Sequence, residues 1–81
     1  MNTVDSDKLL MIHNPDTGLY CRIYPMGGKW HCNPCTSPSK DIKVDVLAPQ
    51  MSGKFMRTTF DTEEEAKNEG HLYISSMNYY R

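Results

Sequence analysis

Three cysteines are the residues of this 81-residue chain with the most distinct chemistry. Cys32 and Cys35 have the Cys-x-x-Cys spacing of zinc ligands, and Cys21 with a histidine could complete a tetrahedral set. A redox pair would need a helix directly after it, but a Pro-Ser segment follows. An odd cysteine count also favours reduced thiols over a disulfide framework. We therefore expect no cofactor and buried apolar Cys21 and Cys32, with a zinc site at Cys21, Cys32 and Cys35 as the alternative.

The histidines His13, His31 and His71 are the candidates for general acid–base chemistry. None has an Asp or Glu at a spacing that suggests a catalytic pair, and no serine lies in a nucleophile-elbow sequence. The glycines belong to turns, because no phosphate-binding loop pattern is present. The sequence therefore predicts that this protein is not an enzyme, since no acid, base and nucleophile set emerges.

Aromatic and cationic residues alternate along the expected strands, which is the pattern of a binding face. Rings on such a face can anchor a protein partner or stack on bases, while cations meet phosphates. Strand alternation places these side chains on the sheet face opposite the helix. The predicted binding residues are Tyr20, Arg22, Tyr24, Lys29, His31, Lys43 and Arg57, with His13 on the same face. The acidic run Glu63–Glu65 is the next candidate.

Short strands and one helix must position these residues. Strands are expected at residues 8–13, 19–24, 29–32, 42–47 and 54–60, with turns rich in Pro, Gly and Asn between them. Residues 1–7 are expected to be flexible, and residues 33–41, with two prolines, to form an irregular loop. The predicted fold is α+β: an antiparallel four- to five-stranded meander sheet with one C-terminal helix packed on one face, in a single domain of residues 1–81.

The helix is expected over residues 61–77, where apolar residues recur at the helical period. Its stripe contains Ala66, Gly70, Tyr73, Ile74, Met77 and Tyr80. Asp61 is expected to cap the helix, with Glu64 completing a capping box. Gly70 on this stripe would let the helix approach the sheet closely, and the contrary prediction is that Gly70 ends the helix.

Two hairpins decide which residues share a face. Asn14 is expected opposite Leu19, and Tyr24 opposite Lys29. The face toward the helix then contains Leu10, Ile12, Cys21, Ile23, Trp30, Cys32, Val44, Val46, Met56 and Phe60. The assignment depends on register, because a slip of one residue inverts a strand.

Charge and hydropathy limit the classes of partner. The formal net charge is −1, divided as +2 over residues 1–60 and −3 over residues 61–81. Near-neutrality argues against binding nucleic acid through bulk charge. No apolar run reaches the roughly 20 residues of a membrane span, and the polar amino terminus is unlike a signal peptide. The sequence predicts a cytoplasmic protein with no membrane partner.

Two resemblances add expectations about function. Gly28-Lys29-Trp30, then a strand, then the segment Thr59 to Ala66 resemble the strand–strand–strand–helix arm-binding domains of phage integrases, over residues 28–75. Those domains read DNA with the sheet, although this chain departs from them in its near-neutral charge and its Cys-Pro loop. In size and style the chain also resembles small phage and mobile-element proteins, including the anti-CRISPR inhibitors.

Three functions are therefore expected, in order of preference. The first is a small non-enzymatic interaction protein that binds a protein surface, as a phage-encoded inhibitor of a host defence complex would. The second is a nucleic-acid-binding module that uses the sheet face away from the helix. The third is a small zinc-stabilised domain. The near-neutral charge makes a protein partner the preferred one, and the oligomeric state stays open.

Overall fold

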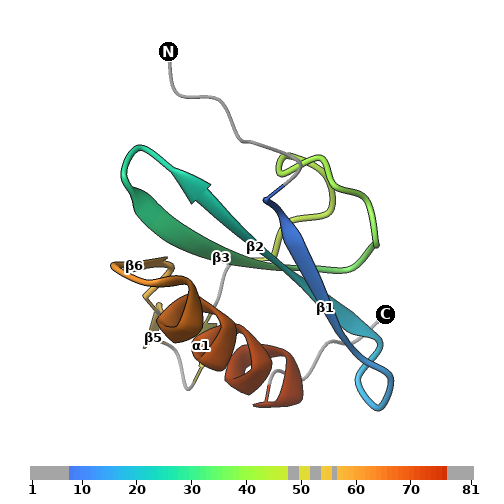
Figure 1. Cartoon of the computed structure of the whole chain (residues 1–81). Coiled ribbons are helices and arrows are strands. Elements are labelled where there is room, and N and C mark those ends of the chain that lie inside the picture. Colours follow the sequence, from blue (N-terminus) through green and yellow to red (C-terminus); the bar gives the residue numbers. More distant parts are fainter. Residues whose placement is uncertain (1–7, 48–49, 52–53, 56, 77–81) are drawn as a thin grey trace.

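A four-stranded antiparallel sheet with one C-terminal helix against it forms the centre of the protein (Figure 1). The computed structural model describes residues 8–47, 50–51, 54–55 and 57–76. The sheet has the order β1-β2-β3-β6, and β4 and β5 pair in a separate hairpin. The elements are β1 (Leu10–Asn14), β2 (Leu19–Met26), β3 (Lys29–Cys35), β4 (Gln50–Met51), β5 (Lys54–Phe55), β6 (Thr59–Phe60) and α1 (Glu63–Ser76). The predicted α+β fold is confirmed. Within the described ranges, α1 included, no helix has the length and apolar character to cross a membrane.

The first hairpin has the register that its turn residues predict. Asn14 pairs with Leu19, Ile12 with Cys21 and Leu10 with Ile23. The Asn14 side chain accepts a hydrogen bond from the Asp16 amide at 2.9 Å, and Gly18 takes the positive φ of 74° that its lack of a Cβ permits. Turn chemistry encoded within five residues therefore fixes this register.

The second hairpin is longer than predicted, and its expected register is wrong by two residues. Gly27 and Gly28 both have positive φ, 63° and 79°, so they form a two-residue turn by themselves. Met26 pairs with Lys29, and Tyr24 pairs with His31 rather than with Lys29. A slip of two residues keeps each side chain on its expected face. The strand β3 also continues through residues 33–35, which were expected to begin the loop.

The helix packs its predicted stripe on the sheet. Ala66, Gly70, Tyr73 and Ile74 are buried, and the helix continues through Gly70 as the stripe predicts. A Cβ on Gly70 would lie 2.9 Å from Ile23 Cδ1 and 3.0 Å from Cys21 Sγ, so any larger residue would force these side chains to shift. The expected stripe residues Met77 and Tyr80 lie outside the described residues.

The predicted helix cap is wrong by one residue. Thr62 Oγ1 accepts the Glu65 amide at 3.2 Å and donates to Glu65 Oε1 at 3.0 Å, which is a capping box. Asp61 instead pairs with Lys29. The threonine hydroxyl can both donate and accept, so it satisfies the amide and the carboxylate together.

The predicted strand at residues 42–47 is wrong. Asp41 starts a turn here: its side chain accepts the Lys43 amide at 2.9 Å and its carbonyl accepts the Val44 amide at 3.2 Å. Asp45 has a φ of 53°, which interrupts an extended chain. Val44 and Val46 are 37% and 45% exposed, so they do not join the core as predicted. A single bridge from Val46 to Cys35 is all that remains of the strand.

The predicted strand at residues 54–60 is divided in two. Residues 54–55 belong to β5 and residues 59–60 to β6, with Arg57 and Thr58 outside any strand. Phe60 is 3% exposed and joins the core. Met56, which was expected on the same face, lies outside the described residues. The core cluster is Leu19, Cys21, Ile23, Cys32, Phe60, Ala66, Tyr73 and Ile74, with Leu10, Ile12, Trp30 and Leu47 packed against it.

Candidate functional site

The middle of the predicted binding face is covered. Residues 36–47 lie on the side of the sheet away from α1 (Figure 1). Arg22, which contacts this segment, is 0% exposed, and Tyr24, two residues farther along β2, is 2% exposed. The prediction that these two side chains are exposed is therefore wrong. The face that should have been one patch is divided into two ends, separated by about 20 Å along β2, at roughly 3.3 Å a residue.

Arg22 is buried because it supplies hydrogen bonds to the segment above it. Its Nε donates to the Ser39 carbonyl at 2.5 Å, and its Nη1 donates to the Val44 carbonyl at 2.7 Å. These carbonyls belong to an irregular segment, so the guanidinium replaces the neighbouring strand that would otherwise satisfy them. The remaining nitrogen, Nη2, is buried and has no partner among the described residues. Arg22 thus fixes residues 39–44 in place.

Tyr24 is held in the same buried layer by its neighbours in β3. Its ring stacks on His31 with centroids 5.4 Å apart and an angle of 10° between the planes. Its hydroxyl accepts a hydrogen bond from the Asn33 side-chain amide. Burial raises the pKa of Tyr24 above its ordinary value. This tyrosine is a structural residue, with no free ring face of the kind a docking anchor needs.

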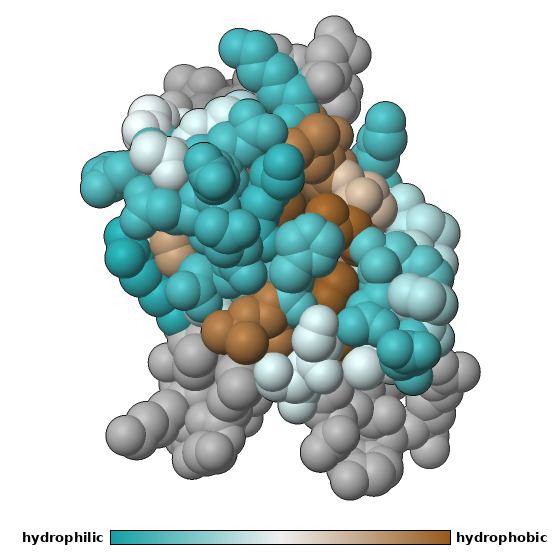
Figure 2. All heavy atoms as spheres, turned by 60° about the horizontal axis from the view of Figure 1, so that its bottom comes forward, coloured by the Kyte–Doolittle hydropathy of each residue, from teal (hydrophilic) through white to brown (hydrophobic). Residues whose placement is uncertain are grey.

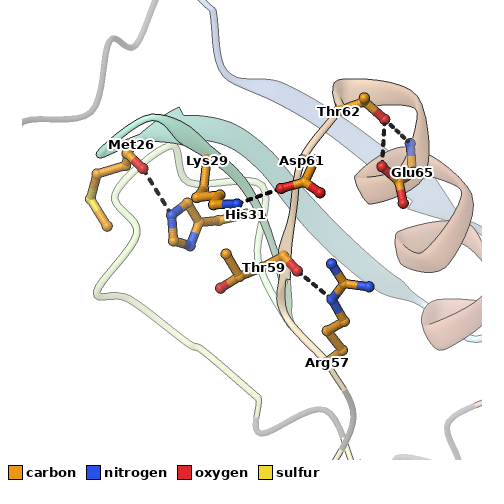
Figure 3. A network of polar contacts seen from close by, with 8 residues as sticks. All are labelled: Met26, Lys29, His31, Arg57, Thr59, Asp61, Thr62 and Glu65. Carbon is orange, nitrogen blue, oxygen red and sulfur yellow. Dashed lines mark hydrogen bonds and ion pairs between the residues drawn. The ribbon is translucent and has the colours of Figure 1, made fainter.

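One end of the face holds the predicted cations, and Figure 3 shows that they are engaged within the chain. Lys29 pairs with Asp61, and this contact holds the pKa of the Asp61 carboxyl below its usual value. His31 Nε2 lies 3.1 Å from the Met26 carbonyl oxygen. Arg57 Nε donates to the Thr59 carbonyl at 2.7 Å, and its guanidinium lies 4.8 Å from the centre of the Phe60 ring. These contacts brace the β2–β3 turn and β6.

The other end of the face forms a cleft. Its floor is a stacked pair, His13 of β1 and Tyr20 of β2, with ring centroids 4.2 Å apart and 14° between the planes. The register places these two residues directly opposite each other. The cleft has a volume of about 520 Å³ and is lined by His13, Gly18, Leu19, Tyr20, Thr36, Ser37 and Pro38. His13 is exposed and Tyr20 half-buried, so the rings are accessible to a partner.

Sequence reasoning found part of this cleft. Tyr20 is a predicted binding residue, and His13 was placed on the same face. Thr36, Ser37 and Pro38 were missed, because nothing in a short polar loop shows which strand it will pass over. Lys43 is exposed in the turn that follows Asp41, outside the lining of the cleft. The acidic candidate at the start of α1 borders a smaller hollow of about 350 Å³, lined by Glu63, Glu64, Lys67 and Asn68.

The cysteines do not converge on one point. Cys32 and Cys35 are three residues apart in an extended strand, so their thiols lie on opposite faces of the sheet. Cys21 and Cys32 share the helix side, where a hydrogen bond that the Cys21 thiol makes to Cys32, together with burial, raises the pKa of Cys21. Cys35 lies on the other side, and burial raises its pKa as well. No group of three ligating side chains in the described ranges could hold a metal ion.

Comparison with known proteins adds no relative. No family model, no curated protein and no solved structure matches this chain. Functional inference for this protein therefore depends on the geometry described above.

Proposed function

We propose that this protein is a small non-enzymatic interaction protein that binds a partner protein at the cleft formed by His13, Tyr20 and residues 36–38. The observation that carries the proposal is the stacked His13–Tyr20 pair in a cleft of about 520 Å³. Tyrosine is enriched among the anchor residues of protein interfaces, because its ring provides a large contact area and its hydroxyl a hydrogen bond.

The cleft end of the predicted face is a better candidate for partner binding than the end that holds the cations. At the cation end, Lys29, His31 and Arg57 already contact groups of the same chain. A partner that bound there would compete with these contacts. At the cleft end, the exposed His13 and the half-buried Tyr20 line the cleft together with the polar residues Thr36 and Ser37.

A nucleic-acid-binding role, the second function expected from the sequence, has less support. A strand-following groove needs cations beside its stacking rings. Arg22 and Tyr24, which should have formed the centre of such a groove, are both buried, and Arg22 is bonded to the carbonyls of residues 39 and 44. The near-neutral net charge gives no compensating attraction for phosphates.

The biological role of the partner is a second, more specific proposal. We propose inhibition of a host defence complex by a phage-encoded protein, which follows from resemblance in size and style. This proposal depends on the identity of the captured partner. A partner with no part in host defence would contradict it and leave the binding proposal intact.

The test is capture of a partner by immobilised protein from a lysate of the cells in which it acts, after nuclease treatment. We expect one protein to be retained by the wild type and by Lys29→Ala, and to be retained much less by His13→Ala. Lys29 is the matched control, because it is exposed at the opposite end of the same predicted face. Loss of all binding on nuclease treatment, or equal retention by His13→Ala, would contradict the proposal.

A further inference from the structure

The two edges of the sheet differ in how far their backbone groups are paired. Short segments close the outer side of β3 along its length. β6 pairs with Trp30 and His31, and the Thr58 carbonyl accepts the Cys32 amide at 2.9 Å. Farther along, the Leu47 amide donates to the Pro34 carbonyl at 2.8 Å, and Val46 bridges Cys35. Few backbone groups on this edge are therefore free to pair with another strand.

The opposite edge is β1, and no described residue pairs with its outer side. In an antiparallel edge strand, alternate residues direct their N–H and C=O groups away from the sheet. Edge strands are normally protected by lysine, proline or a bulge. β1 has the sequence Leu-Met-Ile-His-Asn, which contains no lysine or proline, and its five residues pair one to one with β2 without a bulge. Its backbone is a suitable template for a further strand.

The surroundings of this edge define what such a strand would contain. On the α1 side, Leu10 and Ile12 are only partly buried against the core. Figure 2 turns the α1 side toward the viewer, and hydrophobic side chains reach the surface there between hydrophilic borders. On the other side of the sheet, His13 of the same strand lines the cleft. An added strand would thus meet apolar groups on one face and stacked rings on the other.

We propose that the partner docks by adding an extended segment to the outer edge of β1, with apolar residues toward α1 and one aromatic side chain between them in the cleft. The inference rests on the proposed function and specifies its recognition mode. Backbone hydrogen bonds supply affinity in such strand addition, and pockets for alternate side chains supply specificity. An aromatic ring suits this cleft, because rings stack favourably on rings.

A second copy of this chain is the less suitable occupant. β1 contains no Phe, Tyr or Trp, and its one ring, His13, is already stacked on Tyr20 of its own chain, so two copies joined strand to strand would bring no additional Phe, Tyr or Trp ring to the clefts. The partner segment is therefore a different sequence. Sedimentation of the protein alone checks this point, since a dimer built through β1 would contradict the proposal.

The probe is a displayed library of peptides of roughly six residues, the commonest strand length, with valine, leucine or isoleucine at alternate positions. We expect enriched peptides to carry an aromatic residue at one intervening position. Methylating the backbone nitrogens that face β1 should weaken binding at least about tenfold, because each methyl removes a donor and clashes with the edge. Methylating the intervening nitrogens should weaken it far less, which controls for altered peptide flexibility.

Protein variants separate the two parts of the inference. His13→Ala should abolish the aromatic preference while the dependence on alternate nitrogens persists, and Lys29→Ala should change neither. Absence of enriched peptides, or equal sensitivity at both sets of nitrogens, would overturn strand addition. If either of these results is obtained but the capture experiment still retains a protein whose binding depends on His13, strand addition is wrong and the proposed function is unaffected. Enriched peptides with no partner captured would instead contradict the proposed function.

Discussion

Replacing Gly70 with alanine tests the closest helix–sheet contact in the structure. The new Cβ would lie 2.9 Å from Ile23 Cδ1, 3.0 Å from Cys21 Sγ and 3.2 Å from Ile12 Cδ1. Ile12 is half-buried and can turn aside toward solvent, whereas Ile23 and Cys21 are fully buried, so any shift of their side chains repacks the core. The substitution therefore overpacks the core at the point where α1 crosses β2.

Two opposing terms decide the sign of the effect on stability. Alanine favours a helix over glycine by about 1 kcal/mol, and overpacking a core costs about 1–3 kcal/mol. We expect Gly70→Ala to lower the free energy of unfolding by roughly 0–2 kcal/mol, and Gly70→Leu to lower it further. In a domain of this size, each 1 kcal/mol moves the melting temperature by about 4–8 °C.

Urea denaturation of four variants, Gly70→Ala, Asn68→Ala, Ile23→Val and the double variant of residues 23 and 70, provides the measurement. Asn68→Ala is the matched control, because residue 68 is exposed on the same helix and should gain roughly 0.5 kcal/mol from propensity alone. Ile23→Val removes the contacting methyl group, so it should cost less in the Gly70→Ala background than in the wild type. Stabilisation of Gly70→Ala by about 1 kcal/mol, the propensity value alone, would refute the close contact.

Four further predictions follow from the same structure. Arg22→Met should lower the free energy of unfolding by about 3 kcal/mol in urea, because two loop carbonyls lose a charged donor. Thr62→Ala should cost about 1 kcal/mol in the same assay through loss of the helix cap, and an unchanged midpoint would exclude the cap. Burial raises the pKa of Tyr73 from 10.0 to about 12 in the folded protein, so stability should be full below pH 10.0 and fall as the pH rises toward 12. Tyr73→Phe should lose the bond to the Arg57 carbonyl but show a flatter alkaline decline in melting temperature, and an unaltered decline would assign it to other groups. A chelator should leave the melting temperature unchanged, because Cys32 and Cys35 lie on opposite faces of β3; unfolding on chelation would restore the zinc alternative.

Local signals in the sequence predicted much of the fold. Residues 14–18 specify one turn and hence one register, and the stripe through Ala66, Gly70 and Tyr73 specifies the buried side of α1. The predicted register of the second hairpin was wrong by two residues, but the face assignments stayed correct because side chains alternate with a period of two. Each of these features depends on residues that are close together in the sequence.

Features that depend on distant partners could not be predicted in this way. Residues 42–47 alternate like a strand, but Asp41 turns the chain and Arg22, some twenty residues earlier, takes the Val44 carbonyl. Arginine is rarely buried, so its type gave no sign that a loop would cover it. The cleft was only partly predicted for the same reason. Tyr20 was identified by its type and spacing, whereas residues 36–38 became part of the site only through the path of that loop.

Hydrogen–deuterium exchange of the complex with the captured partner tests the central claim most directly. The account predicts slower amide exchange in residues 10–14 and 36–38 on binding, because the partner covers the β1 edge and the cleft. Residues 29–31, at the opposite end of the predicted face, should exchange as in the free protein. Protection confined to residues 29–31, or to the start of α1 at residues 63–65, with none in β1, would contradict the account.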